Sequence, residues 1–138
     1  LLLEQKNKAE ELFDYAVTHK IVPVGFCPIG SPSRPERDRT AEDIADIEME
    51  TIRKIAEAHN VHPAVICLKW AVQRGMIPIP FSVKEPQYIA NLRCATEDPL
   101  TEEEMEQIRK SDRNCRLIKG QVFLWSGASD WKVLWDEE

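Results

Sequence analysis

The chain has 138 residues, of which 43% are hydrophobic, and a formal net charge of -6 at pH 7. This is enough apolar material for one domain core, and an acidic chain without a basic stripe is not expected to bind nucleic acid or an acidic membrane surface. No apolar run reaches the roughly 20 residues that cross a bilayer, and the charged N-terminal segment does not fit a signal peptide, so we expect a cytoplasmic protein. Because the first residue is Leu1, we expect a processed chain or a piece of a longer protein.

Cysteine and histidine patterns indicate no metal site. The chain has four cysteines, which are widely spread and form no CxxC pair: Cys27, Cys67, Cys94 and Cys115. We therefore expect reduced thiols, without a zinc site or a disulfide framework. The HNVH segment holds His59 and His62 between two helical patterns, without a matching carboxylate or cysteine partner. We interpret these histidines as solvated loop and helix-capping residues.

The first two predicted elements are a helix and a strand. Residues 7–20 repeat apolar positions at helical spacing, which predicts a helix that ends near residue 20. Residues 21–30, IVPVGFCPIG, have the β-branched density of a strand buried on both faces, which is typical of parallel strands beneath helices. Because Pro23 cannot donate to a strand ladder, the alternative is a strand shortened to VGFCP.

A loop and a second helix follow. Residues 31–40 are rich in proline, arginine and serine, which predicts a surface loop. Residues 41–60 are acidic early and basic later, and they place Ile52, Ile55 and Ala56 on one face of a helix.

The third helix is predicted over residues 62–75, with Pro63 suited to its first turn and Gly75 suited to its end. Residues 76–80, MIPIP, predict a second short strand. Pro78 weakens this assignment for the same reason as the earlier proline, and the alternative is a strand shortened to IP.

Two more helices precede the tail. Residues 84–92 predict a helix directly after the second strand, and residues 100–112 predict another, with Thr101 and Glu104 spaced as a capping box. Helices alternating with strands are typical of a parallel α/β sheet, so α/β is the predicted fold class. Residues 112–138 predict a C-terminal loop or lid that is rich in tryptophan.

Two segments carry a resemblance to a known family: IVPVGFCPIGSPSRP and IPIPFSVKEPQYIANL. The chain resembles the C-terminal part of the aldo-keto reductases, in which similar stretches end the seventh and eighth strands of a (β/α)8 TIM barrel. The resemblance covers nearly the whole chain, with both motifs in the right order and spacing. It implies that residues 1–138 form a single partial domain of an incomplete barrel, which binds NADPH or NADH.

The strand-to-helix junction at Ser82, Val83 and Lys84 suits a nucleotide phosphate. A phosphate needs backbone N–H donors and a hydroxyl group, and a helix N-terminus adds partial positive charge. Barrel enzymes often bind phosphate at the ends of the seventh and eighth strands. Without the family resemblance, Ser82 is more simply read as a helix N-cap.

The resemblance assigns residues of both motifs to the cofactor site. Phe26 stands where the family has an aromatic ring that stacks on the nicotinamide, although an ordinary core phenylalanine is the simpler alternative. Cys27 replaces the usual serine and is a weaker hydrogen-bond donor. Arg34 and Arg37 are left out of the site as solvated loop residues. The assigned residues are Phe26, Cys27, Pro28, Ile29, Gly30, Ser31 and Pro32 in the first motif, and Ile79, Phe81, Ser82, Val83, Lys84, Gln87 and Asn91 in the second.

The second motif departs from the family pattern at positions that, by the resemblance, contact the 2'-phosphate of NADPH. Phe81 stands where many members have lysine, Gln87 where they have arginine and Ala90 where they have glutamate, whereas Asn91 matches. In the family, that lysine and arginine hold the 2'-phosphate of NADPH. Replacing a charge-assisted bond by a neutral one forfeits roughly 1 to 2 kcal/mol. With Lys84 as a partial substitute, we expect dual cofactor use or a preference for NADH.

No catalytic residue is assigned. The resemblance implies that an Asp, Tyr, Lys and His set on earlier strands protonates the carbonyl oxygen, and no segment here matches it. Two strands also cannot close a barrel. We therefore expect a part of a longer protein that is inactive alone.

Three functions remain open from the sequence. The first is the C-terminal, cofactor-binding portion of an NAD(P)H-dependent oxidoreductase that reduces aldehydes, ketones or open-chain sugars, with Phe123, Trp125 and Trp131 lining a lid. The second is a truncated noncatalytic module that binds a nucleotide or another chain. The third is a helical interaction protein that uses its acidic helices. The expected partner is a small-molecule carbonyl substrate, and no oligomeric state is specified.

Overall fold

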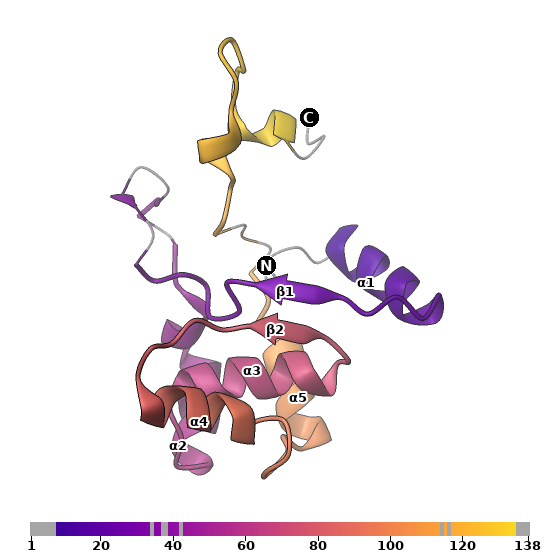
Figure 1. The fold of residues 1–138 in the computed structure, drawn as a ribbon, viewed down its shortest axis with the longest axis vertical. Coiled ribbons are helices and arrows are strands. Elements are labelled where there is room, and N and C mark those ends of the chain that lie inside the picture. The colour runs from indigo at the N-terminus through magenta and orange to yellow at the C-terminus, as the bar shows by residue number, and fades with distance from the viewer. Residues whose placement is uncertain are drawn as a thin grey trace.

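The structure is a computed structural model, and it describes residues 8–33, 35–36, 39–41, 43–113, 115 and 117–134. Helices and a small parallel sheet make it an α/β structure, as the sequence predicts (Figure 1). The elements are α1 (Lys8–Thr18), β1 (Val24–Phe26), the 3-10 helix η2 (Asp46–Glu48), α2 (Glu50–Ala58), α3 (Pro63–Gln73), β2 (Ile77–Ile79), α4 (Glu85–Arg93), α5 (Glu102–Lys110), and the 3-10 helices η3 (Gln121–Phe123) and η4 (Trp131–Leu134).

The sheet consists of β1 paired with β2, side by side and pointing the same way (Figure 1). Val24 lies opposite Ile77, and Phe26 lies opposite Ile79. Each strand is only three residues long, which is shorter than the predicted segments 21–30 and 76–80, although β2 is longer than the alternative IP. Pro23 precedes β1, as the shorter alternative requires, but Pro78 lies in the middle of β2.

The prediction that the first strand is buried on both faces is wrong. Gly25 is buried, whereas the side chains of Val24 and Phe26 are 57% and 48% exposed. Helices α2 to α5 all lie on one side of the strand pair (Figure 1). Because side chains alternate along a strand, a sheet that is covered on one side buries only every second residue. Ile77 and Ile79 are likewise more than half exposed.

The hydrophobic core lies between α2, α3 and α5. Ile52, Ile55 and Ala56 of α2 are all buried, which confirms the predicted helix face. Ile66 of α3 and Ile108 of α5 are inaccessible to solvent and belong to the same cluster. Helix α3 is buried continuously over residues 65–71, so it is the central element of the helical layer.

The ends of the helices follow the sequence signals. The ring of His62 accepts a hydrogen bond from the Ala64 N–H at 3.2 Å, and Pro63 occupies the first turn of α3. Gly75 follows α3 with a φ of 84°, a conformation that suits glycine. The capping box predicted at Thr101 and Glu104 is present at the start of α5.

Helix α1 and the described tail, residues 117–134, each make some contacts with the rest of the fold. The Arg74 guanidinium lies 4.2 Å from the ring centre of Phe13 and 4.5 Å from that of Trp70, which links α1 to α3. In the tail, Leu117 is buried, but Phe123 and Trp125 are 77% and 58% exposed. These two aromatic side chains therefore do not pack against the described part of the fold. Trp135 lies outside the described residues.

No helix in the described part of the chain has the length and apolar character needed to span a membrane.

Candidate functional site

The loops that follow β1 and β2 enclose a cavity of about 510 Å³. Because the strands are parallel, their carboxyl ends lie at the same end of the sheet. Cys27 and Pro80 therefore begin loops that line the same cavity. A cavity of this size, with apolar walls and a few polar groups, is typical of a small-molecule site.

The first loop turns sharply after β1. Cys27 and Ser31 have positive φ angles of 49° and 46°, and Gly30 between them has a φ of 77°. The Gly30 N–H donates to the Cys27 carbonyl at 3.2 Å, which closes the turn. A Cβ atom on Gly30 would lie 2.6 Å from the backbone nitrogen of Asp46 in η2. Glycine therefore allows the loop to pack directly against η2.

The second loop is organised by Ser82. Its hydroxyl donates to the side-chain oxygen of Gln87 at 2.7 Å and accepts from the Lys84 N–H at 3.2 Å. Lys84 itself occupies the N-cap position of α4. The simple interpretation of Ser82 as the N-cap is therefore wrong by two residues. The serine instead links the chain entering α4 to the first turn of that helix.

Most residues assigned from the sequence line this one cavity, and some do not. The lining residues from the assignment are Cys27, Pro28, Ile29, Ser31, Pro32, Ile79, Phe81, Ser82, Gln87 and Asn91. Gly30 is buried against η2, whereas Val83 and Lys84 are exposed in the second loop, just before α4. Phe26 does not line the cavity, but it pairs with Ile79, which does.

Helix α3 supplies a wall that the sequence reasoning missed. Ala64, Val65 and Leu68 line the cavity from α3, and His62 lines it from the cap of that helix. Helical spacing predicted that Val65 and Leu68 share a face, but it could not identify what that face contacts. Ser33, Pro80, Pro86 and Ala90 complete the lining.

The cavity offers binding groups more clearly than catalytic ones. Hydroxyl groups come from Ser31 and Ser82, and side-chain amides come from Gln87 and Asn91. Tyr15 and Tyr88 lie on the exposed surfaces of α1 and α4, and neither lines the cavity. No described tail residue lines it either. Arg34 and Arg37 lie outside the described residues.

The remaining cysteine and histidine positions show what the sequence could and could not predict. None of the four cysteines forms a disulfide bond, and burial raises the pKa of the Cys67 thiol. Within the described residues, no three His, Cys, Asp or Glu side chains are grouped to hold a metal ion. His62 takes the N-cap of α3 and His59 the C-cap of α2, as the predicted capping role requires. His59 is not solvated, however, because its side chain is only 11% exposed and contacts Asp98 and Glu104. Both carboxylates lie far along the chain, where local sequence patterns cannot identify them.

Comparisons with known proteins agree on one family. The family model described as "Aldo/keto reductase family" matches residues 1–113. An aldo/keto reductase of Synechocystis is 32% identical over 128 residues, covering 92% of this chain and 39% of that protein. The NADPH-dependent D-xylose reductase of Candida boidinii is 38% identical over 108 residues, covering 77% of this chain and 33% of that protein. The NAD(P)H-dependent D-xylose reductase of Kluyveromyces lactis is 32% identical over 110 residues, covering 78% of this chain and 33% of that protein. The chain thus spans well under half the length of these curated relatives.

The tight contact at Gly30 predicts an unequal effect of two glycine substitutions. Gly30→Ala and Gly75→Ala both place alanine at a positive φ, which costs roughly 1 to 2 kcal/mol. Only Gly30→Ala also forces a Cβ against the η2 backbone, whereas a Cβ at Gly75 meets nothing within 4 Å. We expect Gly30→Ala to lower the free energy of unfolding by about 1 to 3 kcal/mol more than Gly75→Ala, as measured by urea denaturation. Equal losses would contradict the observed packing of the loop on η2.

Proposed function

This chain belongs to the aldo/keto reductase family, and we propose that it is the C-terminal, cofactor-binding portion of an NAD(P)H-dependent oxidoreductase that reduces aldehydes, ketones or open-chain sugars. The observation that carries the proposal is the shared cavity between the loops that follow β1 and β2. Both loops contain the segments that resemble the family's cofactor motifs, and parallel strand ends are the usual place for a nucleotide in such sheets.

The polar groups of the cavity suit the phosphates and sugars of a dinucleotide. Ser31 and Ser82 present hydroxyl groups from opposite loops, and Asn91 presents an amide from α4. The N-terminus of α4 and the exposed ammonium group of Lys84 add positive charge at the edge of the second loop. These groups bind and orient a cofactor, while the cofactor supplies the hydride.

The apolar side of the cavity suits the flat rings of the cofactor. Ile29 and Ile79 line it from the two loops, and Val65 and Leu68 line it from α3. Phe26 lies beside Ile79 in the sheet, on the face that the helices leave open. We assign Phe26 to stacking on the nicotinamide at the sheet end of the cavity.

Cofactor choice follows from the pair formed by Ser82 and Gln87. The hydroxyl of Ser82 already donates to the Gln87 side-chain oxygen, so both groups form a neutral wall where a 2'-phosphate would need positive charge. Phe81, which is 90% exposed, adds no charge at the same place. The Candida relative is named NADPH-dependent and the Kluyveromyces relative NAD(P)H-dependent. For this protein we propose dual use or a preference for NADH.

The exposed apolar face of the sheet supports the proposal that residues 1–138 are one partial domain of a larger barrel. Val24, Phe26, Ile77 and Ile79 each expose about half of their side chains. Further strands of a (β/α)8 barrel would cover this face and pair with the free strand edges. We assign β1 and β2 to the seventh and eighth strands of that barrel. Residues 112–138 are proposed to form a substrate lid. The proposed location of the protein is the cytoplasm.

The same apolar face also favours a second candidate function. A noncatalytic module could bury it against another chain while it keeps nucleotide affinity. The two functions differ in the acid and base set that carbonyl reduction requires. If the coding sequence before Leu1 carries an Asp, Tyr, Lys and His set, the reductase is supported, whereas a stop codon there favours the module.

Steady-state kinetics test the reductase directly. We expect the product of the whole coding sequence to oxidise NADH and NADPH with comparable kcat/KM in the presence of an aldehyde or an open-chain sugar. The 138-residue chain should show no turnover in the same assay, because it lacks the acid and base set. No turnover by the longer product, or a large preference for NADPH, would contradict the proposal.

The role of Gln87 predicts how cofactor choice can be changed. Gln87→Arg adds a guanidinium to the cavity wall, and a charge-assisted bond worth about 1.5 kcal/mol corresponds to roughly a tenfold gain in kcat/KM for NADPH relative to NADH. Tyr88→Arg is the matched control, because it adds the same charge to the neighbouring position of α4 outside the cavity. If both variants change the cofactor ratio equally, the effect is one of overall charge and the proposed contact is wrong.

A further inference from the structure

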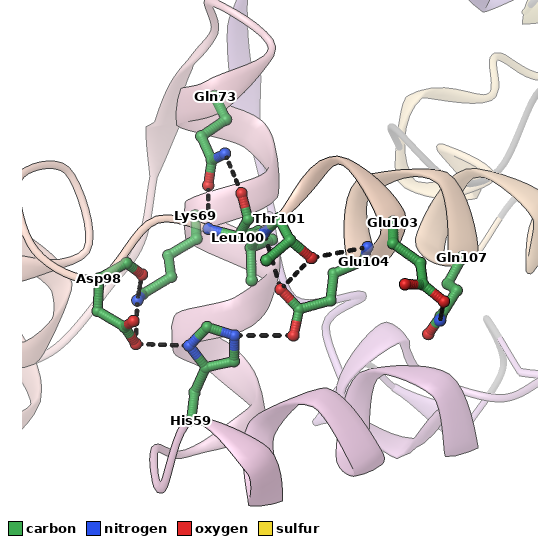
Figure 2. A network of polar contacts seen from close by, with 9 residues as sticks. All are labelled: His59, Lys69, Gln73, Asp98, Leu100, Thr101, Glu103, Glu104 and Gln107. Atoms are coloured by element: carbon green, nitrogen blue, oxygen red, sulfur yellow. Dashed lines mark hydrogen bonds and ion pairs between the residues drawn. The ribbon is translucent and has the colours of Figure 1, made fainter.

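His59 forms the centre of a polar network at the end of α2 (Figure 2), and none of His59, Asp98 and Glu104 lines the cavity described above. Its Nδ1 lies 2.5 Å from a carboxylate oxygen of Asp98, and its Nε2 lies 2.9 Å from a carboxylate oxygen of Glu104. The ring is held between these groups with only 11% of the side chain exposed.

This geometry requires a charged ring. A neutral imidazole has one N–H donor and one bare nitrogen, and an ionised carboxylate can only accept hydrogen bonds. Both contacts are satisfied together only when both ring nitrogens carry protons. Loss of one proton would leave a bare nitrogen facing a carboxylate oxygen, so one of the two contacts would become repulsive.

The positive and negative charges of the network are equal in number only when the His59 ring is protonated. Lys69 of α3 is 3% exposed, and its ammonium group donates to the backbone carbonyl of Asp98 and lies 3.2 Å from the same carboxylate oxygen that His59 contacts. His59 and Lys69 thus offset the charges of Asp98 and Glu104. A neutral His59 would leave two carboxylates and one ammonium group.

The network joins parts of the fold that are far apart in sequence. His59 follows α2, Lys69 belongs to α3, Asp98 belongs to the connection between α4 and α5, and Glu104 lies in the first turn of α5. Glu104 uses its other oxygen to accept from the Thr101 N–H at 2.8 Å, which completes the cap of α5. Leu100 is anchored independently, because its N–H and carbonyl both bond to the side chain of Gln73 at 2.7 and 2.9 Å.

A second cavity, of about 470 Å³, lies beside this network. Lys69 and Asp98 line it together with residues of α4, including Ala90 and Arg93. Val65 and Ala90 also line the first cavity, so the two cavities share part of one wall. Asp98 therefore forms part of the wall of the second cavity.

We propose that His59 is a proton-operated clamp that holds the connection between α4 and α5, residues 94–101, against α2 and α3. With the ring protonated, Asp98 is fixed between His59 and Lys69. Loss of the proton leaves a bare ring nitrogen facing one carboxylate, and Asp98 is the partner that can turn into solvent, because its side chain is 60% exposed whereas that of Glu104 is 17% exposed. Asp98 is then held by Lys69 alone, so the residues between α4 and Leu100 loosen and the second cavity opens on the side of Asp98.

The direction of the pH dependence follows from the contacts. The bond to Asp98 raises the pKa of His59 above 6.5; burial opposes this effect and Glu104 adds to it. Stabilisation by His59 is therefore complete below about pH 6.5 and is lost as the pH rises through the raised pKa. On the acid side, the bonds from His59 and Lys69 lower the pKa of Asp98. Burial would raise the pKa of Glu104, but bonds from Thr101 and His59 outweigh it. The clamp is thus fully formed only at pH values above the lowered pKa values of Asp98 and Glu104 and below the raised pKa of His59.

Nuclear magnetic resonance of the 138-residue chain tests the clamp without any cofactor. We expect the His59 ring to titrate above pH 6.5, with both ring nitrogens protonated below its midpoint. Across the same midpoint, hydrogen-exchange protection of the Thr96 and Glu97 amides, corrected for intrinsic rates, should fall several-fold. The Leu100 amide should keep its protection, because Gln73 does not titrate. A His59 midpoint at or below 6.5, or unchanged protection at Thr96 and Glu97, would overturn the proposal.

Two histidine variants separate the clamp from general pH effects. His59→Gln cannot donate from both ends of its side chain, so the pH dependence of Thr96 and Glu97 protection should disappear. His19→Gln removes an exposed histidine that follows α1 and contacts Tyr15 rather than the network, so it should leave that dependence intact. Persistence of the dependence in His59→Gln would contradict the proposal. If that variant does not fold, the titration of the unmodified chain still decides the question.

Discussion

The parallel pairing of β1 with β2 is the constraint on which the candidate site depends. Because Phe26 lies opposite Ile79 with both strands pointing the same way, the next residues of each strand emerge at one edge. A parallel pair needs a long crossover, and α2 with α3 provides it. The crossover helix α3 then lies beneath both loops and forms the wall of the cavity with Val65 and Leu68. The parallel pairing of the two strands therefore accounts for both the helical crossover and the position of the cavity.

The strands themselves are too short to fix this arrangement alone. Three residues per strand give few ladder bonds, and each contributes only about 1 kcal/mol net. The helical core supplies the rest, because α3 is buried along most of its length and packs on α2 and α5 through residues such as Ile52, Ile66 and Ile108. The polar network at His59 also joins α2 and α3 to the connection between α4 and α5. The side chains on the uncovered face of the sheet take part in none of these contacts.

The sequence predicted the elements that local signals define and failed where distant contacts decide. Helical spacing identified the buried face of α2, and capping residues identified the starts of α3 and α5. The β-branched segment at residues 21–30 was misread as a fully buried strand, because burial depends on what covers each face. The two motifs were identified one by one through a family resemblance, but their meeting with α3 at one cavity is a tertiary property. Asp98 and Glu104 around His59 were missed for the same reason.

Hydrogen exchange of the 138-residue chain with and without a dinucleotide tests the central claim most directly. If the two loops hold one cofactor, saturating NADH or NADPH should slow exchange in residues 27–33 and in residues 81–91 together, with the same concentration dependence. The amides of α5, which does not line the cavity, should be unaffected. Protection of one loop without the other, or of neither loop at saturating concentrations of both cofactors, would contradict the account.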